Sequence, residues 1–409
     1  MVELEQDGRR IVLDVGLPLE QIPFRDLLPD VDGLWSHGDG SLEGVFITHG
    51  HPDHFGLADL VDPSVPIYMG KGAKSVIDES AFFTGREPGF GCAGFLKDES
   101  AISAGPFTVT PHLVDHSGFD AHGLLVEAGG HSLLYTGDIR FHGRKSDRMN
   151  RLPGKLPENL DCLLMEGTNF DRARPEGPAS EQELEAHLAS SFQSVKGSAV
   201  CFFSAQNTDR LVTIFRSAKK SGRTFVYDLY GATIAAATER SSIPQPTWDE
   251  VRILVRERER RQVLRTEEFF RVKGLADHRI YRDEIAKDPS RFVLTGRASS
   301  VEELAESGCL RGARAYWSMW GGYLDRDSML TEALARNSVD VETAHVSGHA
   351  TSEDLVDFAR RVDPNKVVSI HARSPLFLNS RVPSFQPTSD REWWSVSSAQ
   401  RQASRHQEA

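Results

Sequence analysis

Hydrophobic residues along this chain gather in short runs, and several of these runs end in a polar residue that can bind a metal. Gly44-Val45-Phe46-Ile47 precedes a histidine cluster, and the runs Phe107–Val114, His131–Gly137 and Lys366–Ile370 are each followed within two positions by a His or an Asp. Short apolar runs bounded by turn residues are typical of buried strands. Such runs alternate with short helical segments up to about Met165, which predicts sheets packed between helices.

The pattern changes after that point. Arg172 to Ser180 is rich in proline, glycine and charge, which predicts a crossing into a second domain. A strand over Ser198–Ser204, a helix over Thr208–Lys220 and a strand over Arg223–Asp228 form a predicted βαβ unit. Further on, we expect one long helix over Ile253–Phe270, strands over Arg291–Thr295 and Ala313–Ser318, and an amphipathic helix over Ser352–Val362.

Composition agrees with a cytoplasmic enzyme, which is the location we expect. We expect no signal peptide, since the first residues hold no apolar run preceded by basic residues, and no apolar stretch in the 409 residues has membrane-spanning length. Four cysteines without a Cys-x-x-Cys pair argue against a disulfide framework and against a thiolate zinc site. The net charge of −12 is unfavourable for nucleic-acid binding. Basic residues nevertheless follow Asp138 and Glu166, either as a phosphate-binding patch or for loop solubility: Arg140, Arg144, Lys145, Arg148, Arg151, Arg172 and Arg174.

The segment His49-Gly50-His51-Pro52-Asp53-His54 holds three imidazoles and a carboxylate within six positions. Gly50 and Pro52 turn the chain sharply, so the four side chains converge instead of alternating across a strand. Imidazole and carboxylate suit zinc or manganese, and four ligands from one loop are enough to begin two metal sites. The alternative is a polar surface turn. Three further ligand candidates favour the metal site, and each follows a strand-like run: His116, Asp138 and His371.

This order of residues resembles the metallo-β-lactamase fold, whose pattern is His-x-His-x-Asp-His, then a His, a bridging Asp and a last His. The resemblance implies an αββα sandwich and two divalent ions, with zinc expected and manganese as the alternative. It also implies two ligand sets, in which one ion is held by His49, His51 and His116, the other by Asp53, His54 and His371, and Asp138 lies between them.

The second half resembles the β-CASP nucleases of this fold, and among them bacterial ribonuclease J. Leu163-Leu164-Met165-Glu166 is a strand ending in an acid, and His345-Val346-Ser347-Gly348-His349-Ala350 is a Ser-Gly-His turn. The resemblance assigns the motif A acid to Glu166 and the motifs B and C histidines to His349 and His371. The group usually continues with Gly-Glu after the last histidine, whereas this chain reads Ala372-Arg373.

The resemblance also implies a domain plan. Residues 1–170 and 345–385 are expected to form the metallo-β-lactamase domain. Residues 171–344 are expected to form an inserted β-CASP domain with a Rossmann-like parallel sheet. Residues 386–409 are expected to form a C-terminal tail that is partly disordered, because Ser, Gln and Arg dominate its composition.

The expected function is a metal-dependent ribonuclease that acts on single-stranded RNA, as a 5′-to-3′ exonuclease with possible endonuclease activity and as a possible homodimer. A hydroxide held between two ions about 3.5–4 Å apart would attack phosphorus in line. Asp53 would orient the water or accept its proton, His349 would protonate the departing oxygen, and Glu166 would orient a ligand or His349.

Four residues are expected to bind substrate. His345 and Ser347 would grip the phosphate, whereas Ser204 and Asn207 either bind substrate at the end of a parallel strand or cap the following helix. Trp317, Trp320 and Tyr323 offer either stacking surfaces for bases or core packing. Two other function classes stay open, namely a hydrolase of small esters, lactones or thioesters on the same fold and an inactive scaffold subunit.

Overall fold

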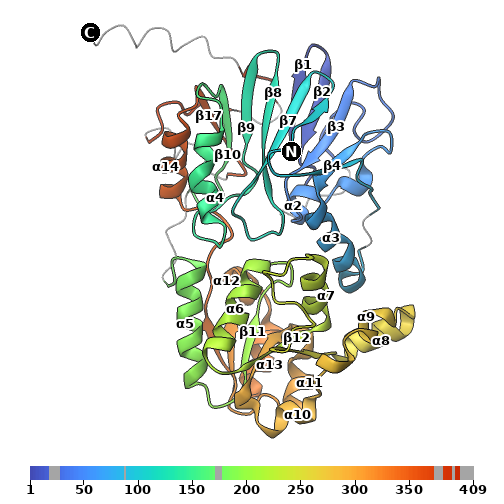
Figure 1. Cartoon of the computed structure of the whole chain (residues 1–409), viewed down its shortest axis with the longest axis vertical. Coiled ribbons are helices and arrows are strands. Elements are labelled where there is room, and N and C mark those ends of the chain that lie inside the picture. The colour runs from blue at the N-terminus through green and yellow to red at the C-terminus, as the bar shows by residue number, and fades with distance from the viewer. Residues whose placement is uncertain (18–27, 87–88, 171–176, 373–380, 389–391, 397–409) are drawn as a thin grey trace. The chain divides into compact units, whose positions relative to one another are not determined.

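The computed structural model describes residues 1–17, 28–86, 89–170, 177–372, 381–388 and 392–396. Its contacts divide the chain into two compact units (Figure 1). The first unit comprises Met1–Lys74, Pro88–Pro175 and Gly348–Ala409, and the second comprises Ser75–Glu87 and Glu176–Ser347. One internal segment, Ser75–Glu87, is an exception to the domain plan expected from the sequence, because it groups with the second unit.

The helix α3 (Lys71–Thr84) explains that exception. Its far end carries Phe82, which is buried in one hydrophobic cluster with Leu229 and Val263 of the second unit. Glu79, on the same part of the helix, forms an ion pair with Arg271. The apolar and charged partners of residues 75–87 are therefore far away in the sequence, which is why a pattern along the chain does not reveal them.

The first unit contains two sheets. One has the strand order β1-β2-β3-β4-β5. An Asp7-Gly8 turn with φ of 51° and 75° joins its first two strands, as tight antiparallel hairpins require, and the remaining pairs are parallel. The strands are β1 (Val2–Gln6), β2 (Arg9–Leu13), β3 (Leu42–Ile47), β4 (Ile67–Gly70) and β5 (Gly94–Leu96).

The other sheet has the order β17-β10-β9-β8-β7-β6. It is antiparallel from β6 to β9 and parallel across β9, β10 and β17. The strands are β6 (Ile102–Ala104), β7 (Phe107–Leu113), β8 (His122–Ala128), β9 (His131–Tyr135), β10 (Cys162–Glu166) and β17 (Lys366–Ile370). The last of these has the bounds that the sequence predicts.

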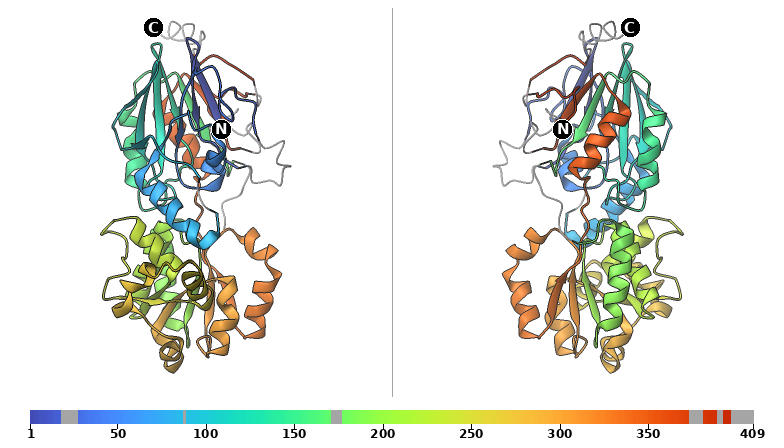
Figure 2. Two further views of the ribbon diagram at one scale, coloured as in Figure 1. Left: turned by 90° about the vertical axis from the view of Figure 1, so that its right-hand side faces the viewer. Right: turned by 90° about the vertical axis from the view of Figure 1, so that its left-hand side faces the viewer.

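Alternating side chains of the two sheets form a shared core between them. Ile11 and Phe46 from the first sheet pack in one cluster with Val109, Leu124 and Leu164 from the second. On the opposite face of the second sheet, Leu163 packs with buried residues of the helices α4 (Ser146–Arg151) and α14 (Ser352–Val362). Figure 2 shows these layers from two sides. The first unit is thus the helix-covered double sheet that the sequence predicts.

The second unit is built on one parallel sheet with the order β13-β12-β14-β11-β15-β16. Its first two elements after the helix α5 (Glu181–Ser194) are β11 (Ala199–Phe202) and α6 (Thr208–Lys220), followed by β12 (Thr224–Asp228), which form the predicted βαβ unit. The other strands are β13 (Val251–Leu254), β14 (Phe292–Gly296), β15 (Arg314–Trp317) and β16 (Asp340–Thr343).

Helices cover both faces of this sheet. Phe192 of α5 packs on Tyr316, and Phe215 of α6 packs on Phe225. The opposite face carries a cluster that includes Val226, Leu304 and Leu334. The remaining helices are α7 (Leu229–Ala237), α8 (Glu257–Thr266), α9 (Phe270–Lys273), α10 (Arg282–Lys287), α11 (Val301–Glu306), α12 (Gly321–Arg326) and α13 (Ser328–Arg336).

The long helix expected over Ile253–Phe270 is wrong. The strand β13 includes Ile253 and pairs in parallel with β12, and α8 begins only at Glu257. The helix ends where Glu267 adopts the left-handed conformation, at φ of 58°. The apolar residues at the start of this segment form a strand because they pair with β12. This tertiary pairing outweighs the helical preference of the Arg- and Glu-rich residues that follow.

Part of the predicted tail contacts the strand β17. The backbone N–H of Gln386 donates to the carbonyl of Val367 at 2.9 Å, and the Lys366 ammonium lies 4.4 Å from the centroid of the Trp394 ring. Residues 389–391 and 397–409 of that tail lie outside the described residues. Among the described helices, none has the length and apolar character needed to cross a lipid bilayer.

Candidate metal centre

The histidine cluster lies directly after β3 and continues into the short helix α2 (Pro52–Phe55). This loop is fixed against the chain that follows β2, because the backbone N–H of Val15 donates to the carbonyl of His54 at 2.8 Å. Gly16 allows this approach, since a Cβ there would lie 1.6 Å from the carbonyl oxygen of Asp53. Backbone contacts therefore hold the ligand loop where the strand ends.

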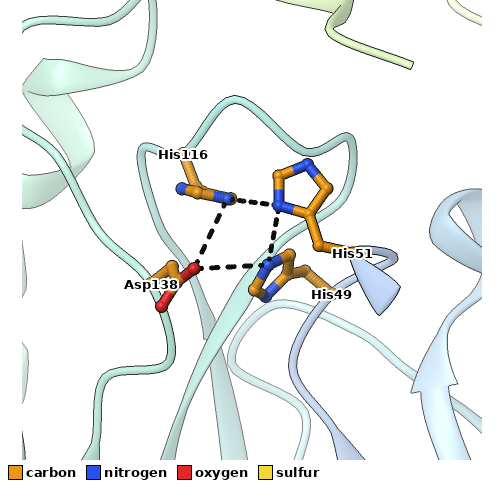
Figure 3. Close-up of side chains that lie close together, drawn as sticks. All are labelled: His49, His51, His116 and Asp138. Carbon is orange, nitrogen blue, oxygen red and sulfur yellow. Dashed lines mark hydrogen bonds and ion pairs between the residues drawn. The ribbon is translucent and has the colours of Figure 1, made fainter. Parts of the chain in front are cut away.

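One ligand set brings together His49, His51, His116 and Asp138, as Figure 3 shows. The Nε2 atoms of His49 and His116 lie 3.1 Å and 3.0 Å from the Nδ1 atom of His51. The Asp138 Oδ2 atom is 3.7 Å from His49 Nε2 and 4.0 Å from His116 Nε2. Three imidazole nitrogens and one carboxylate oxygen around a common point are a donor set that zinc prefers.

A second ligand set brings together Asp53, His54, His371 and the same Asp138. The Nε2 atom of His54 lies 3.2 Å from Asp138 Oδ2, and Nε2 of His371 lies 3.3 Å from Asp53 Oδ2. The Asp138 Oδ1 atom is 3.8 Å from His371 Nδ1. Asp138 therefore faces both sets, as a bridging carboxylate must.

The buried charges and polar atoms of the centre fit divalent cations. Within the part of the chain that the structure describes, His54 Nε2 and Asp138 Oδ1 are buried without a hydrogen-bond partner, although buried polar atoms nearly always have one. Burial lowers the pKa of His49 and of His116 well below the usual histidine range, so both rings are neutral at pH 7 and able to bind metal.

Burial opposes a charge on His54 as well, but the carboxylates of Asp138 and Asp14 outweigh it and raise the pKa of His54 well above its usual value. A cation would compete with a proton for this ring, because the metal-binding form of histidine is the neutral one.

Asp14 orients the His54 ring and is the main residue that the sequence analysis missed. Its Oδ2 atom lies 2.7 Å from His54 Nδ1 and accepts the hydroxyl protons of Thr48 and Tyr135 at 2.9 Å and 2.8 Å. Since His54 Nδ1 donates to this carboxylate, Nε2 is the ring nitrogen that faces the metal. The available signal was the position of Asp14 directly after the apolar run Ile11-Val12-Leu13.

Two other ligands are oriented by groups that are distant in the sequence. His116 Nδ1 lies 2.8 Å from the carbonyl oxygen of Gly348. Because a carbonyl oxygen can only accept a hydrogen bond, Nδ1 carries the proton, and Nε2 of His116 carries the lone pair for the metal. The Nδ1 atom of His371 lies 2.9 Å from the Thr168 hydroxyl. His371 itself has a φ of 54°, a strained backbone conformation for a non-glycine residue.

Glu166 and His349 form a pair beside Asp138. The Glu166 carboxylate is fully buried, and its Oε2 atom lies 3.4 Å from His349 Nδ1, which is 3.7 Å from Asp138 Oδ2. Burial lowers the pKa of His349, but the Glu166 and Asp138 carboxylates outweigh it and raise this pKa to about 9. Glu166 therefore faces the interior of the site and not the solvent.

The basic residues after Asp138 mostly serve the structure of the first unit. The Arg140 side chain is completely buried and its Nε donates to Asp115 at 3.3 Å, while Arg148 pairs with Asp98 at 2.7 Å. The Lys145 ammonium donates to the carbonyl of His116 at 3.1 Å. The expected Arg172 and Arg174 lie outside the described residues.

The candidates Ser204 and Asn207 belong to the second unit, in the loop after β11. Asn207 caps α6, because its Oδ1 accepts the backbone N–H of Arg210 at 2.9 Å. Ser204 is exposed, and its hydroxyl accepts the N–H of Gln206 at 3.3 Å. For Asn207 the capping alternative accounts for the side chain.

His345 and Ser347 also belong to the second unit. His345 Nδ1 lies 3.3 Å from the guanidinium of the buried Arg210, which is paired with Glu181 at 3.0 Å. Because arginine can only donate, His345 Nδ1 is the unprotonated nitrogen of its ring. Arg210 also donates to the carbonyl of Val346 at 3.0 Å, so the backbone that carries Ser347 is tied to α6.

The aromatic candidates divide between core and surface. Trp317 is a core residue with 4 % exposure, so it offers no stacking surface. Trp320 and Tyr323 are 46 % and 55 % exposed and touch edge to face, with the Arg326 guanidinium 5.5 Å from the Trp320 ring centroid.

The fold and the paired ligand sets define a class of protein. Residues 9–212 match the family model of the β-lactamase superfamily domain. A crystal structure of a protein of unknown function from Enterococcus faecalis V583 superposes with a TM-score of 0.76 at 22 % identity, covering 95 % of this chain and 93 % of that one. The chain therefore carries a β-lactamase superfamily domain and has the metallo-β-lactamase fold.

Within that class the chain resembles ribonuclease J. It is 29 % identical to ribonuclease J of Mycobacterium tuberculosis (strain CDC 1551 / Oshkosh) over 233 residues, which cover 54 % of this chain and 41 % of the relative. It is 23 % identical to ribonuclease J 2 of Staphylococcus aureus (strain NCTC 8325 / PS 47) over 242 residues, with the same coverage. The matched region thus spans about two-fifths of the length of these relatives.

Proposed function

We propose that this protein is a metal-dependent ribonuclease that hydrolyses phosphodiester bonds in single-stranded RNA. Its main activity in this proposal is that of a 5′-to-3′ exonuclease. The observation that carries the proposal is the position of His349 and Glu166 beside the shared ligand Asp138. Hydrolysis of a small ester does not require this additional carboxylate and imidazole. The similarity to ribonuclease J supports a nucleic-acid substrate.

Two divalent ions, with zinc expected and manganese as the alternative, would supply Lewis acidity for a phosphate oxygen and lower the pKa of water toward neutrality. The residues that hold them are those of the two ligand sets defined above. Asp53, which contacts His371 and has a side chain that is 17 % exposed, orients the attacking water or accepts its proton.

His349 supplies the proton that the departing sugar oxygen requires. Its pKa of about 9 keeps the ring protonated at neutral pH, and Glu166 holds the Nδ1 side of the ring. Nε2 is then the nitrogen that passes the proton to the leaving oxygen, a contribution of about 10²–10⁴-fold in rate. Glu166 acts through His349 and is a positioning residue.

The second unit has the properties of a β-CASP insertion, since a parallel sheet interrupts the first domain in the sequence. We assign His345 and Ser347 to phosphate binding and Ser204 to the substrate-binding loop, with Asn207 shaping that loop as a helix cap. We also propose a cytoplasmic location and a homodimer. These two points rest on the family resemblance alone.

The test compares 5′-labelled single-stranded RNA carrying a 5′-monophosphate with the same RNA carrying a 5′-hydroxyl, each with added Mn²⁺ or Zn²⁺. We expect the wild type to release labelled mononucleotide from the monophosphate substrate and His349→Ala to lose this activity. His131→Ala is the matched control, because His131 is a half-exposed histidine of the same unit.

Two outcomes would overturn the proposal. If neither RNA nor DNA is cut while a simple ester is hydrolysed equally by wild type and His349→Ala, the protein is a small-ester hydrolase. If no substrate is cut although two ions are bound per chain, it is a scaffold with an intact metal centre.

A further inference from the structure

The first unit contains another group of metal-binding side chains that shares no residue with the centre at Asp138. Asp98 and Glu99 lie in the turn between β5 and β6, and His112 lies on β7. One ligand atom from each of the three residues lies within 4.8 Å of the others. Carboxylates on a surface turn are common without an ion, so the decisive residue is His112.

His112 is buried, with 5 % exposure, and both of its ring nitrogens have no hydrogen-bond partner among the described residues. A neutral imidazole always carries one N–H and one lone pair, and leaving such groups buried and unpaired is unfavourable. Its partner across the sheet is Gly123, which has no side chain to offer. Buried atoms of this kind call for an unseen water or ion.

The two carboxylates are held in place by the backbone of the neighbouring strand. Asp98 Oδ1 accepts the N–H of Leu113 at 2.8 Å, and the N–H of Glu99 donates to the carbonyl of Pro111 at 2.8 Å. Glu99 has a φ of 61°, so the turn adopts an uncommon conformation to reach β7. The ligand atoms are thus arranged before any ion binds, which reduces the entropy lost on binding.

Two positively charged side chains already pair with these carboxylates. Arg148 donates to Asp98 at 2.7 Å, and Lys155 pairs with Glu99. The Lys155 side chain is flexible and 40 % exposed, so its ammonium group can move into water. A divalent ion at this position would compete with Lys155 in particular, and this competition gives the site a measurable signature.

We propose that His112, Asp98 and Glu99 form a separate mononuclear site for a divalent transition-metal ion of the zinc class, which fastens the turn Lys97–Ser100 onto β7. One imidazole and two carboxylates leave the other positions to water, and the imidazole favours zinc-like ions over calcium or magnesium. Burial also lowers the pKa of His112, which leaves the ring in its neutral, metal-binding form at pH 7. The site would stabilise the fold and does not depend on the nuclease activity.

Anomalous diffraction at the zinc absorption edge, from wild-type crystals grown with Zn²⁺, tests the site directly. We expect a peak beside the His112 ring in addition to those at the Asp138 centre. In solution, the zinc content measured after dialysis should fall by about one ion per chain in His112→Gln. His131→Gln is the matched control and should keep the wild-type content, because His131 is a half-exposed histidine that lies 3.5 Å from an acid, Asp161.

A second variant covers the case in which His112→Gln does not fold. Lys155→Met removes the competing cation, and we expect the affinity of this site for Zn²⁺ to rise at least about tenfold, since like charges a few ångströms apart repel strongly at a partly buried site. Equal zinc content in wild type and His112→Gln would overturn the proposal. So would an anomalous map with peaks at the Asp138 centre alone and an ordered water at His112.

Discussion

The Asp14 carboxylate and the His54 imidazole lie 2.7 Å apart, from Oδ2 to Nδ1, although 40 positions separate them in the chain. Asp14 thereby fixes both the orientation of the ring and the nitrogen that faces the metal. The same carboxylate accepts from Thr48 and Tyr135, so a single residue connects the ligand loop to both sheets of the first unit.

Replacing Asp14 should therefore weaken the metal centre without removing a ligand. In Asp14→Asn the His54 ring loses its charged partner, and the expected loss in affinity for the ion at His54 is about 10–100-fold. Metal titration against a chelator of known affinity measures it. Tyr135→Phe removes only one hydroxyl from the network and should lose less. Equal metal affinity in Asp14→Asn and wild type would contradict the role of Asp14.

Glu166→Gln should change the pH dependence of the reaction. The Glu166 carboxylate is a main cause of the raised pKa of His349, so its removal lowers that pKa below the present value of about 9. Activity that needs protonated His349 falls as the pH rises through this pKa. The alkaline limb of the profile of kcat against pH should therefore move to lower pH in Glu166→Gln. An unshifted limb accompanied by a uniform loss of kcat would assign Glu166 a purely structural role.

Removing the metal ions should lower thermal stability. Binding at 100 to 1,000 times Kd contributes about 3–4 kcal/mol, and each kcal/mol corresponds to about 2–4 °C in a domain of this size. Calorimetry before and after chelation should thus give a Tm lower by about 5–15 °C. In Asp138→Ala, where both ligand sets lose their shared residue, chelation should produce only the smaller response of the His112 site. An unchanged Tm in the wild type would contradict this.

The second unit should have its own dependence on pH through Asp228. Burial raises the pKa of this carboxyl, but the guanidiniums of Arg297, at 2.6 Å, and Arg256 outweigh it and lower the pKa to about 2. Because the folded-state pKa lies below the unfolded value, the carboxylate stabilises the fold above about pH 4, and this contribution is lost as the pH falls toward 2. Its size is about 2 kcal/mol.

Urea unfolding of wild type and Asp228→Asn at a series of pH values measures this contribution. The difference in the free energy of unfolding should be largest near neutral pH and should shrink as the pH falls below about 4. A difference that does not vary with pH would mean that the substitution acts through packing and not through charge.

Patterns along the chain were sufficient for the elements that depend on local contacts. The bounds predicted for α6, α14 and the strand β17 agree with the structure, because in each case one apolar face or one apolar run is enough to define the element. The prediction failed for Ile253–Phe270, where β13 owes its form to pairing with β12. Strand pairing depends on residues that are far apart in the sequence.

The candidate ligands of the metal centre can be read directly along the chain, from their types, their order and their positions after strand-like runs. The contacts that hold those ligands depend on the three-dimensional fold. The contacts of Asp14 with His54, of Gly348 with His116 and of Thr168 with His371 join segments that are 40, 232 and 203 positions apart. Local propensities carry no information about such contacts, because they form only when packed sheets bring distant strand ends to the same edge.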